Sequence, residues 1–138
     1  MELNEMTGAI VDTALGIHRE LGPGLLESVY GMVLAKALQR RGFLVEQQKA
    51  ITFQYDGLLF ENAFRIDLLI EGLIIVELKS VEKLAPVHGK QLLTYLRLMN
   101  LPIGLLINFG AASLKEGIHR VLNNCSTVIP KPLNSHRE

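Results

Sequence analysis

The chain has 138 residues, of which 49% are hydrophobic and 20% are charged, so it suits one compact domain and leaves no room for a second domain of ordinary size. Basic and acidic residues both number 14, and the resulting net charge of +0 excludes a whole-molecule field that attracts polyanions. Apolar runs such as LPIGLLINF are too short to cross a bilayer, so we expect no membrane association.

Cysteine usage and the N-terminal residues indicate a reducing compartment. Cys125 is the single cysteine and cannot form an internal disulfide. The first residues show no basic start followed by an apolar run. We therefore expect a cytoplasmic protein.

Two helices are predicted in the first third of the chain. Apolar residues recur at helical spacing over residues 5–20, until LGPG at 21–24 interrupts the pattern. A second helix begins between residues 24 and 27 and ends near Arg41, before Gly42. On this helix Glu27 shares a face with Tyr30. Glu27 is either a carboxylate on a partly buried stripe or an acid in the first turn that interacts favourably with the helix dipole.

Three consecutive strands are predicted next, as an antiparallel meander. One strand covers about residues 50–55, the Asp56-Gly57 dipeptide makes a turn, and a second strand covers about residues 59–70. A third strand follows the turn at Glu71 and Gly72. The even-numbered positions from 64 to 78 on these last two strands are apolar, which predicts one continuous hydrophobic face.

Four charged residues occupy the opposite face of this hairpin: Arg65, Asp67, Glu77 and Lys79. Side chains along a strand point alternately to the two faces of the sheet. Two residues that lie opposite each other on the hairpin and share a face with the same parity must therefore have residue numbers whose sum is even. A strict two-residue turn gives an odd sum, and we therefore predict a three-residue loop or a bulge over residues 71–73, with Gly72 at any positive φ. This register places Asp67 opposite Glu77.

The remaining elements are a helix, a strand and a second helix. A loop ending at Pro86 precedes a helix over residues 87–100, on which His88, Gln91 and Tyr95 form a polar stripe. Residues 103–109 are a fourth, buried strand, and residues 114–122 a short final helix. We expect one domain over residues 1–125 and a strap or frayed tail over residues 126–138.

The opposed carboxylates are the strongest sign of chemistry. Asp67 and Glu77 repel each other unless a cation lies between them. Their oxygens and the main-chain carbonyl of Leu78 are hard donors that suit Mg²⁺ or Mn²⁺. Lys79, on the same face, can orient or deprotonate a water or neutralise phosphate charge. Spacing alone favours a second interpretation over a metal site, in which these charges and Arg65 form cross-strand ion pairs on a solvated sheet face.

The spacing of these residues resembles a known family. Asp67 is followed after nine residues by Glu77-Leu78-Lys79, and later by Gln91 and Tyr95 at Q-x-x-x-Y spacing. The pattern is similar to the PD-(D/E)XK nuclease superfamily, in its exonuclease-like branch. It departs from the superfamily only before Asp67, where Ile66 replaces proline.

A further motif, HRELGPGLLESVY at residues 18–30, is similar to the signature of the small GxxExxY proteins of that superfamily, with Gly24, Glu27 and Tyr30 as the named positions. The resemblance covers about residues 10–122. It implies an α/β, restriction-endonuclease-like core in the order α-β-β-β-α-β, with a mixed four-stranded sheet flanked by helices.

The resemblance also implies roles for the site residues. Glu27, Asp67 and Glu77 would bind the metal, and Lys79 would serve the attacking water. Gln91 and Tyr95 would position the substrate or the lysine, although Tyr95 by itself also suits a core aromatic. From the residues alone, Arg65 contacts the scissile phosphate or pairs with a carboxylate. His88 contacts phosphate or caps its helix.

The expected function is a Mg²⁺- or Mn²⁺-dependent nuclease, with DNA favoured by the resemblance alone. An alternative is a catalytically silent module that keeps the nuclease fold and binds nucleic acid or a protein. A weaker third option is a hydrolase of nucleotides or other phosphate compounds. The chain is too short for a separate recognition domain, so a homodimer or an unidentified protein partner would supply targeting.

Overall fold

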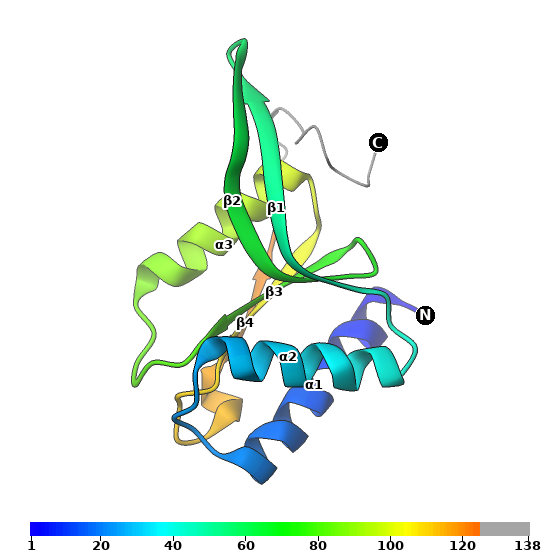
Figure 1. Cartoon of the computed structure of the whole chain (residues 1–138), viewed down its shortest axis with the longest axis vertical. Coiled ribbons are helices and arrows are strands. Elements are labelled where there is room, and N and C mark those ends of the chain that lie inside the picture. Colours follow the sequence, from blue (N-terminus) through cyan, green and yellow to red (C-terminus); the bar gives the residue numbers. More distant parts are fainter. Residues whose placement is uncertain (125–138) are drawn as a thin grey trace.

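A five-stranded sheet with helices against both faces forms the framework of the protein (Figure 1). The computed structural model describes residues 1–124, so Cys125 and the predicted tail at 126–138 lie outside the described residues. The elements follow in chain order: α1 Leu3–Leu21, α2 Glu27–Arg40, β1 Val45–Tyr55, β2 Leu58–Ile70, β3 Ile74–Lys79, α3 Pro86–Met99, β4 Ile103–Asn108, the 3₁₀ turn η1 Leu114–Gly117, and β5 Ile118–Leu122. The predicted order of helix, three strands, helix and strand is confirmed.

The strands lie side by side in their sequence order, β1-β2-β3-β4-β5. Three neighbouring pairs are antiparallel, and only β3 and β4 are parallel. A parallel pair requires a crossover connection, which α3 provides. The mixed sheet therefore follows directly from one helix inserted between two buried strands.

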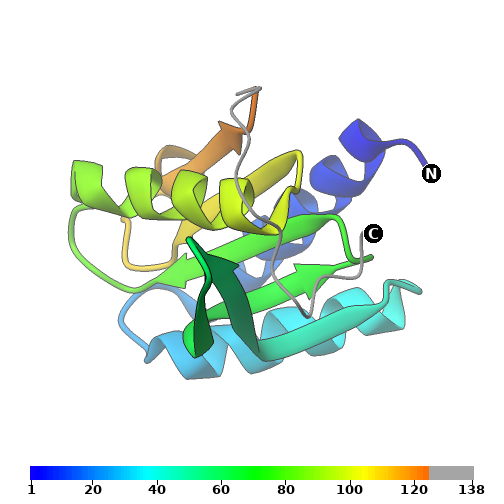
Figure 2. The same ribbon diagram turned by 90° about the horizontal axis from the view of Figure 1, so that it is seen from above.

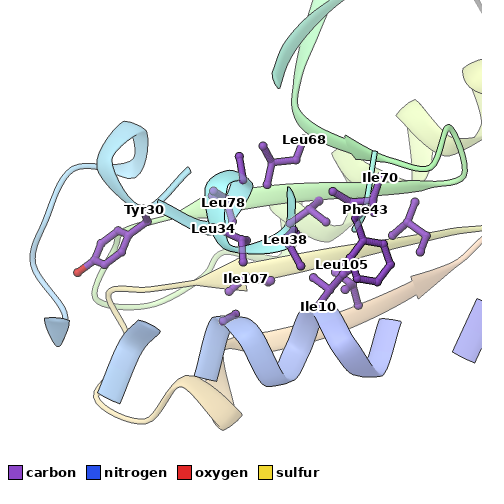
Figure 3. Close-up of a cluster of buried hydrophobic side chains, with 14 of the residues drawn as sticks. Ile10, Tyr30, Leu34, Leu38, Phe43, Leu68, Ile70, Leu78, Leu105 and Ile107 are labelled. Carbon is purple, nitrogen blue, oxygen red and sulfur yellow. The ribbon is translucent and has the colours of Figure 1, made fainter. Parts of the chain in front are cut away.

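Two hydrophobic clusters hold the helices on the sheet, one on each face (Figure 2). On one face, α1 and α2 pack through residues such as Ile10, Leu34 and Leu38 against β2, β3 and β4 (Figure 3). On the other face, α3 packs through Leu92 and Leu96. Within residues 1–124, no helix combines the length and the apolar character needed to cross a membrane.

The β2–β3 hairpin has the predicted register. Leu68 pairs with Val76 and Ile70 with Ile74, so a three-residue loop over 71–73 joins the strands. Gly72 takes the expected positive φ of 65°, and the preceding Glu71 also has a positive φ, of 56°. The even-sum register, continued by one residue, places Asp67 opposite Glu77 as predicted.

The predicted continuous apolar face of β2 is wrong. Leu68 packs in the cluster under α1 and α2, whereas Ile66 packs in the cluster under α3. The two faces exchange where β1 and β2 bend, at Gln48, which has a left-handed φ of 49° in the middle of β1. Beyond this bend the β1–β2 hairpin projects away from the domain (Figure 1).

The predicted final helix at 114–122 and the four-stranded sheet are also wrong. Residues 114–117 form the 3₁₀ turn, and β5 is a fifth strand that pairs antiparallel with β4. Apolar residues at 114, 118, 121 and 122 have helical spacing, which misled the prediction. The strand forms instead because β4 is buried along its whole length, and pairing with β5 satisfies its second row of backbone groups.

Candidate active site

The side chains of Asp67 on β2 and Glu77 on β3 each accept a hydrogen bond from the backbone of the other strand. The Asp67 N–H donates a hydrogen bond of 3.1 Å to Glu77 Oε1. The Leu78 N–H in turn donates a hydrogen bond of 2.7 Å to Asp67 Oδ2. Glu77 is only 8% exposed. Both carboxylates are therefore fixed by backbone donors on the neighbouring strand.

Burial makes the Glu77 carboxylate weakly acidic. Loss of water around the group, together with the charge of Asp67 and a hydrogen bond to its side chain, raises the pKa of Glu77 from 4.5 to about 8. The N–H of Asp67 and the charge of Lys79 act in the opposite direction. A Glu77 pKa of about 8 favours the protonated form of this group at neutral pH when no cation is bound.

Tyr95 on α3 feels the charge of the same carboxylates, and Gln91 is its hydrogen-bond partner. Burial raises the pKa of Tyr95 above 10, and the charges of Glu77 and Asp67 raise it further, while a hydrogen bond with Gln91 lowers it. The Tyr95 ring stacks on Phe64 of β2, with the ring centroids 4.1 Å apart. The helix and the bent strand therefore hold a protonated hydroxyl close to the acidic pair.

Glu27 meets the end of β3 from the first turn of α2. Its Oε2 accepts a hydrogen bond of 3.3 Å from the N–H of Ser80, the residue after Lys79. The Ser80 hydroxyl donates to the carbonyl of Leu25, which precedes α2. Two hydrogen bonds thus attach the start of α2 to the strand that carries Glu77 and Lys79.

Tyr30 anchors the loop in front of Glu27. Its ring is fully buried and stacks on Phe109 at 4.3 Å. Its hydroxyl, which points away from the core cluster in Figure 3, donates to the carbonyl of Gly22 and accepts from the N–H of Leu25. Gly24, at a φ of 105°, provides the turn. Gly24 and Tyr30 therefore fix the loop that places Glu27 against Ser80.

Gln48 lies across from Asp67, since its neighbours Gln47 and Lys49 pair with the residues that flank Asp67. Its amide nitrogen donates a 3.3 Å hydrogen bond to Asp67 Oδ1. Arg65 donates to the Gln48 carbonyl, so the structure assigns Arg65 neither a carboxylate partner nor a free guanidinium. Sequence reasoning missed Gln48 because a left-handed glutamine inside a strand has no compositional signature.

Two further polar residues position segments next to the site. His88 Nδ1 accepts a hydrogen bond from the Ala85 N–H at the start of α3, which is the capping role considered from the sequence. Asn108, only 2% exposed, accepts from the N–H groups of Val81 and Gly110 and donates to the Val81 carbonyl. Asn108 fixes the chain after Ser80. A polar residue that ends an apolar strand was the available signal for it.

The acidic pair fits a hard divalent cation. Mg²⁺ needs only one or two protein carboxylates and keeps several waters. The charge of Asp67 raises the pKa of Glu77, and a cation bound to both carboxylates would remove this repulsion. Within residues 1–124, no three or more His, Cys, Asp or Glu side chains lie close enough to share an ion, so Glu27 does not join the pair in one cluster. The set therefore suits Mg²⁺ or Mn²⁺ and does not suit a structural zinc site.

Comparison with known proteins identifies the family of the chain. Residues 4–121 match the model of the PD-(D/E)XK nuclease superfamily. Comparison with curated proteins and with solved structures gives no significant match. The family match includes both strands of the acidic hairpin, α2 and α3, in the order the structure shows. Since this match spans most of the chain, the protein belongs to the PD-(D/E)XK nuclease superfamily.

Proposed function

We propose that the protein is a Mg²⁺- or Mn²⁺-dependent nuclease that hydrolyses phosphodiester bonds of DNA. The observation that carries this proposal is the buried Asp67–Glu77 pair, in which each carboxylate accepts a hydrogen bond from the backbone of the other strand, with Lys79 two residues beyond Glu77 on β3. A pair that served only as structure would be more stable with one carboxylate replaced by an amide. Membership of the superfamily supports a nuclease with nucleic acid as its ligand.

The metal would be held by Asp67, Glu77 and the main-chain carbonyl of Leu78. Glu27, which does not join the two carboxylates in one cluster, would face the same site from α2 without binding the ion directly. Superfamily members typically use divalent metals. Once bound, such an ion supplies positive charge against the phosphate and increases the acidity of water. The backbone hydrogen bonds to Asp67 and Glu77 orient both carboxylates in advance.

Lys79 would act on the attacking water or on the phosphate. Lys79 follows Glu77 by two residues on β3 and so lies on the same face of the strand, and its charge lowers the pKa of Glu77. It is therefore placed to donate a hydrogen bond to a non-bridging phosphate oxygen, or to hold the water that attacks phosphorus. The protonated Tyr95 hydroxyl, with Gln91 on it, is a second donor for the substrate. Arg65 and His88 complete the proposed substrate contacts.

We also assign the chain to the GxxExxY group within the superfamily. The support is local: Gly24, Glu27 and Tyr30 cooperate in one loop that docks on Ser80. A cytoplasmic location, and targeting through a second copy or a protein partner, are further proposals from the sequence.

The test is a cleavage assay with labelled single- and double-stranded DNA and RNA, in Mg²⁺, in Mn²⁺ and in EDTA. We expect metal-dependent cleavage of DNA. Asp67→Asn should abolish it, and Lys79→Ala should reduce the rate by about 10²- to 10⁴-fold, as loss of a group that transfers or stabilises a proton does.

Matched controls are Asp12→Asn on α1 and Lys115→Ala in η1, which lie on elements that carry none of the proposed site residues. Both should cleave like the wild type. Cleavage undiminished in the Asp67 and Lys79 variants, or no cleavage of any substrate, would refute the nuclease proposal and leave the silent nuclease-fold module.

A further inference from the structure

A groove of about 460 Å³ opens beside the acidic pair, between α2 and the bend of the β1–β2 hairpin. Asp67 and Glu27 both line it. Its apolar lining includes Leu68 and Leu78, which belong to the core, and Gly31 of α2. In Figure 1, α2 passes below the bend of β1 and β2. The groove therefore begins at two of the residues to which we assign the cleavage chemistry.

The lining of the groove suits a flat ring with a polar edge. Its volume lies within the range of about 300–1,000 Å³ that is usual for small-molecule sites. Gln47 and Gln48 contribute amides to it, and a glutamine amide can pair with the edge of a nucleobase by giving and accepting a hydrogen bond. The Gln48 amide nitrogen is engaged by Asp67. Gln47 is exposed, and its side-chain amide makes no hydrogen bond within residues 1–124, so this amide is available to a ligand.

The charge of the groove decides between a base and a phosphate as its occupant. Of the residues described, none that lines the groove is a lysine or an arginine, and two are acidic. A phosphate inside it would be repelled by Asp67 and Glu27. A neutral base meets no such repulsion, and the exposed thioether of Met32, also in the lining, packs well on an aromatic ring.

We propose that this groove receives one unpaired nucleobase next to the phosphate that is cleaved. A base inside a duplex is stacked on both faces and paired at its edge, so only a single strand, a frayed end or an extruded nucleotide can supply it. The substrate class is therefore single-stranded DNA or DNA with unpaired nucleotides. This inference rests on the proposed nuclease function for its biological meaning, but the binding event can be tested without cleavage.

Gly31 offers a substitution that fills the groove without touching a carboxylate. A Cβ at this position would lie 3.4 Å from Leu78 Cδ1, an ordinary contact, so alanine fits. Leucine would extend further and occupy the groove. Gly8 of α1 is the matched control, because it is also a helical glycine and no atom lies within 4 Å of its Cβ position. Both substitutions replace glycine with a better helix former.

The probe is a short single-stranded DNA that carries one 2-aminopurine, with Ca²⁺ in place of Mg²⁺ to limit cleavage. Wild-type protein should increase its fluorescence, because the base leaves the stack of its neighbours. Gly31→Leu should remove this increase and weaken binding by about 2- to 12-fold, the loss expected when one contact between a base and a thioether is excluded. Gly8→Leu and Gly31→Ala should bind nearly like the wild type. The wild-type protein should bind a blunt duplex of the same sequence weakly. Its affinity for the duplex should equal the affinity of Gly31→Leu for the single strand.

Gln47→Leu provides an independent measurement that does not depend on packing around α2. It should reduce differences in affinity among homo-oligomers of the four bases, whereas Gln54→Leu, further along β1, should leave them unchanged. Equal behaviour of single-stranded RNA would support the groove as a base site, because the sugar is not part of the inference.

Undiminished binding and fluorescence in Gly31→Leu would overturn the inference, even if the protein cleaves DNA. Duplex binding as tight as single-strand binding would overturn it as well. Conversely, binding that depends on Gly31 in a protein that cuts nothing would support the base site and refute the nuclease function.

Discussion

The carboxyl group of Glu77 lies against the main-chain N–H of Asp67 at 3.1 Å, while the side chain of Asp67 accepts from Leu78 on the strand of Glu77. Each acid is thus held by the backbone of the opposite strand. This arrangement keeps both side chains in place whether or not a cation neutralises them. It also makes the free energy of unfolding depend on the protonation of Glu77.

The stability of the metal-free protein should fall as pH rises from about 5 to 8. The folded-state pKa of Glu77 is raised to about 8 from 4.5, so between these values the folded state holds a proton that the unfolded state has lost. The contribution is complete below pH 4.5 and disappears through pH 8, with a slope of up to about 1.4 kcal/mol per pH unit.

The measurement is urea unfolding of the wild type and of Glu77→Gln across this pH range in EDTA. As pH increases, the free energy of unfolding of the wild type should fall relative to that of Glu77→Gln. A difference that stays constant would mean that Glu77 is already ionised in the folded protein.

Metal binding should release a proton below pH 8. A cation bound by Asp67 and Glu77 would displace the proton of Glu77, so the dissociation constant for Mg²⁺ should fall by about tenfold per pH unit up to the pKa of Glu77 and then level off. Calorimetry in buffers of different ionisation enthalpy measures both quantities. Asp67→Asn should lose the binding signal, and Asp12→Asn should keep it. An affinity that does not change with pH would contradict this coupling.

Removal of the Tyr30 hydroxyl should destabilise the protein by about 1–3 kcal/mol, because the Gly22 carbonyl and the Leu25 N–H then lose their partner. Tyr30→Phe retains the ring stacked on Phe109, so the loss reports the hydroxyl alone. Chemical unfolding measures it. Tyr55→Phe, at a side chain that is 58% exposed, is the control and should have almost no effect. Similar values for both variants would show that the hydroxyl of Tyr30 does not hold the loop.

The protein with Gln48→Gly should be more stable than the protein with Gln48→Ala. Both substitutions remove the hydrogen bond to Asp67, but only glycine relieves the left-handed φ of 49°. A left-handed residue other than glycine costs about 1–2 kcal/mol, which is more than the cost of about 0.5–1 kcal/mol for glycine in a strand. The free energy of unfolding of Gln48→Gly should therefore be about 0.5–1 kcal/mol larger than that of Gln48→Ala. The order should reverse at Gln54, which lies in the same strand with a negative φ. Thermal unfolding of the four variants decides this.

Sequence pattern predicted the acidic hairpin in detail because strand geometry is local. The alternation of side chains, combined with the even-sum argument, placed Asp67 opposite Glu77 and required the odd loop at 71–73. The Asp56-Gly57 turn and the break before α2 were similarly local, since each depends on residues with unusual backbone preferences. The residues on α3 followed from helical spacing alone.

The linkage of α2 to this hairpin depended on contacts between distant parts of the chain. Nothing in the sequence shows that Ser80 holds both Glu27 and Leu25, or that Asn108 fixes the chain beyond Ser80. These hydrogen bonds join residues that are 27 to 55 positions apart. Each forms because the ends of α2, β3 and β4 converge at one edge of the fold.

By itself, the sequence determined the order of the elements from α1 to β4, the register of the β2–β3 hairpin and the identity of the acidic pair, because these follow from side-chain periodicity along short stretches. Only the tertiary structure decided that residues 118–122 form a strand and that β1 and β2 bend at Gln48. In both places local preference was overridden by the need to pair the backbone of a buried sheet. The groove beside Asp67 exists because of that bend.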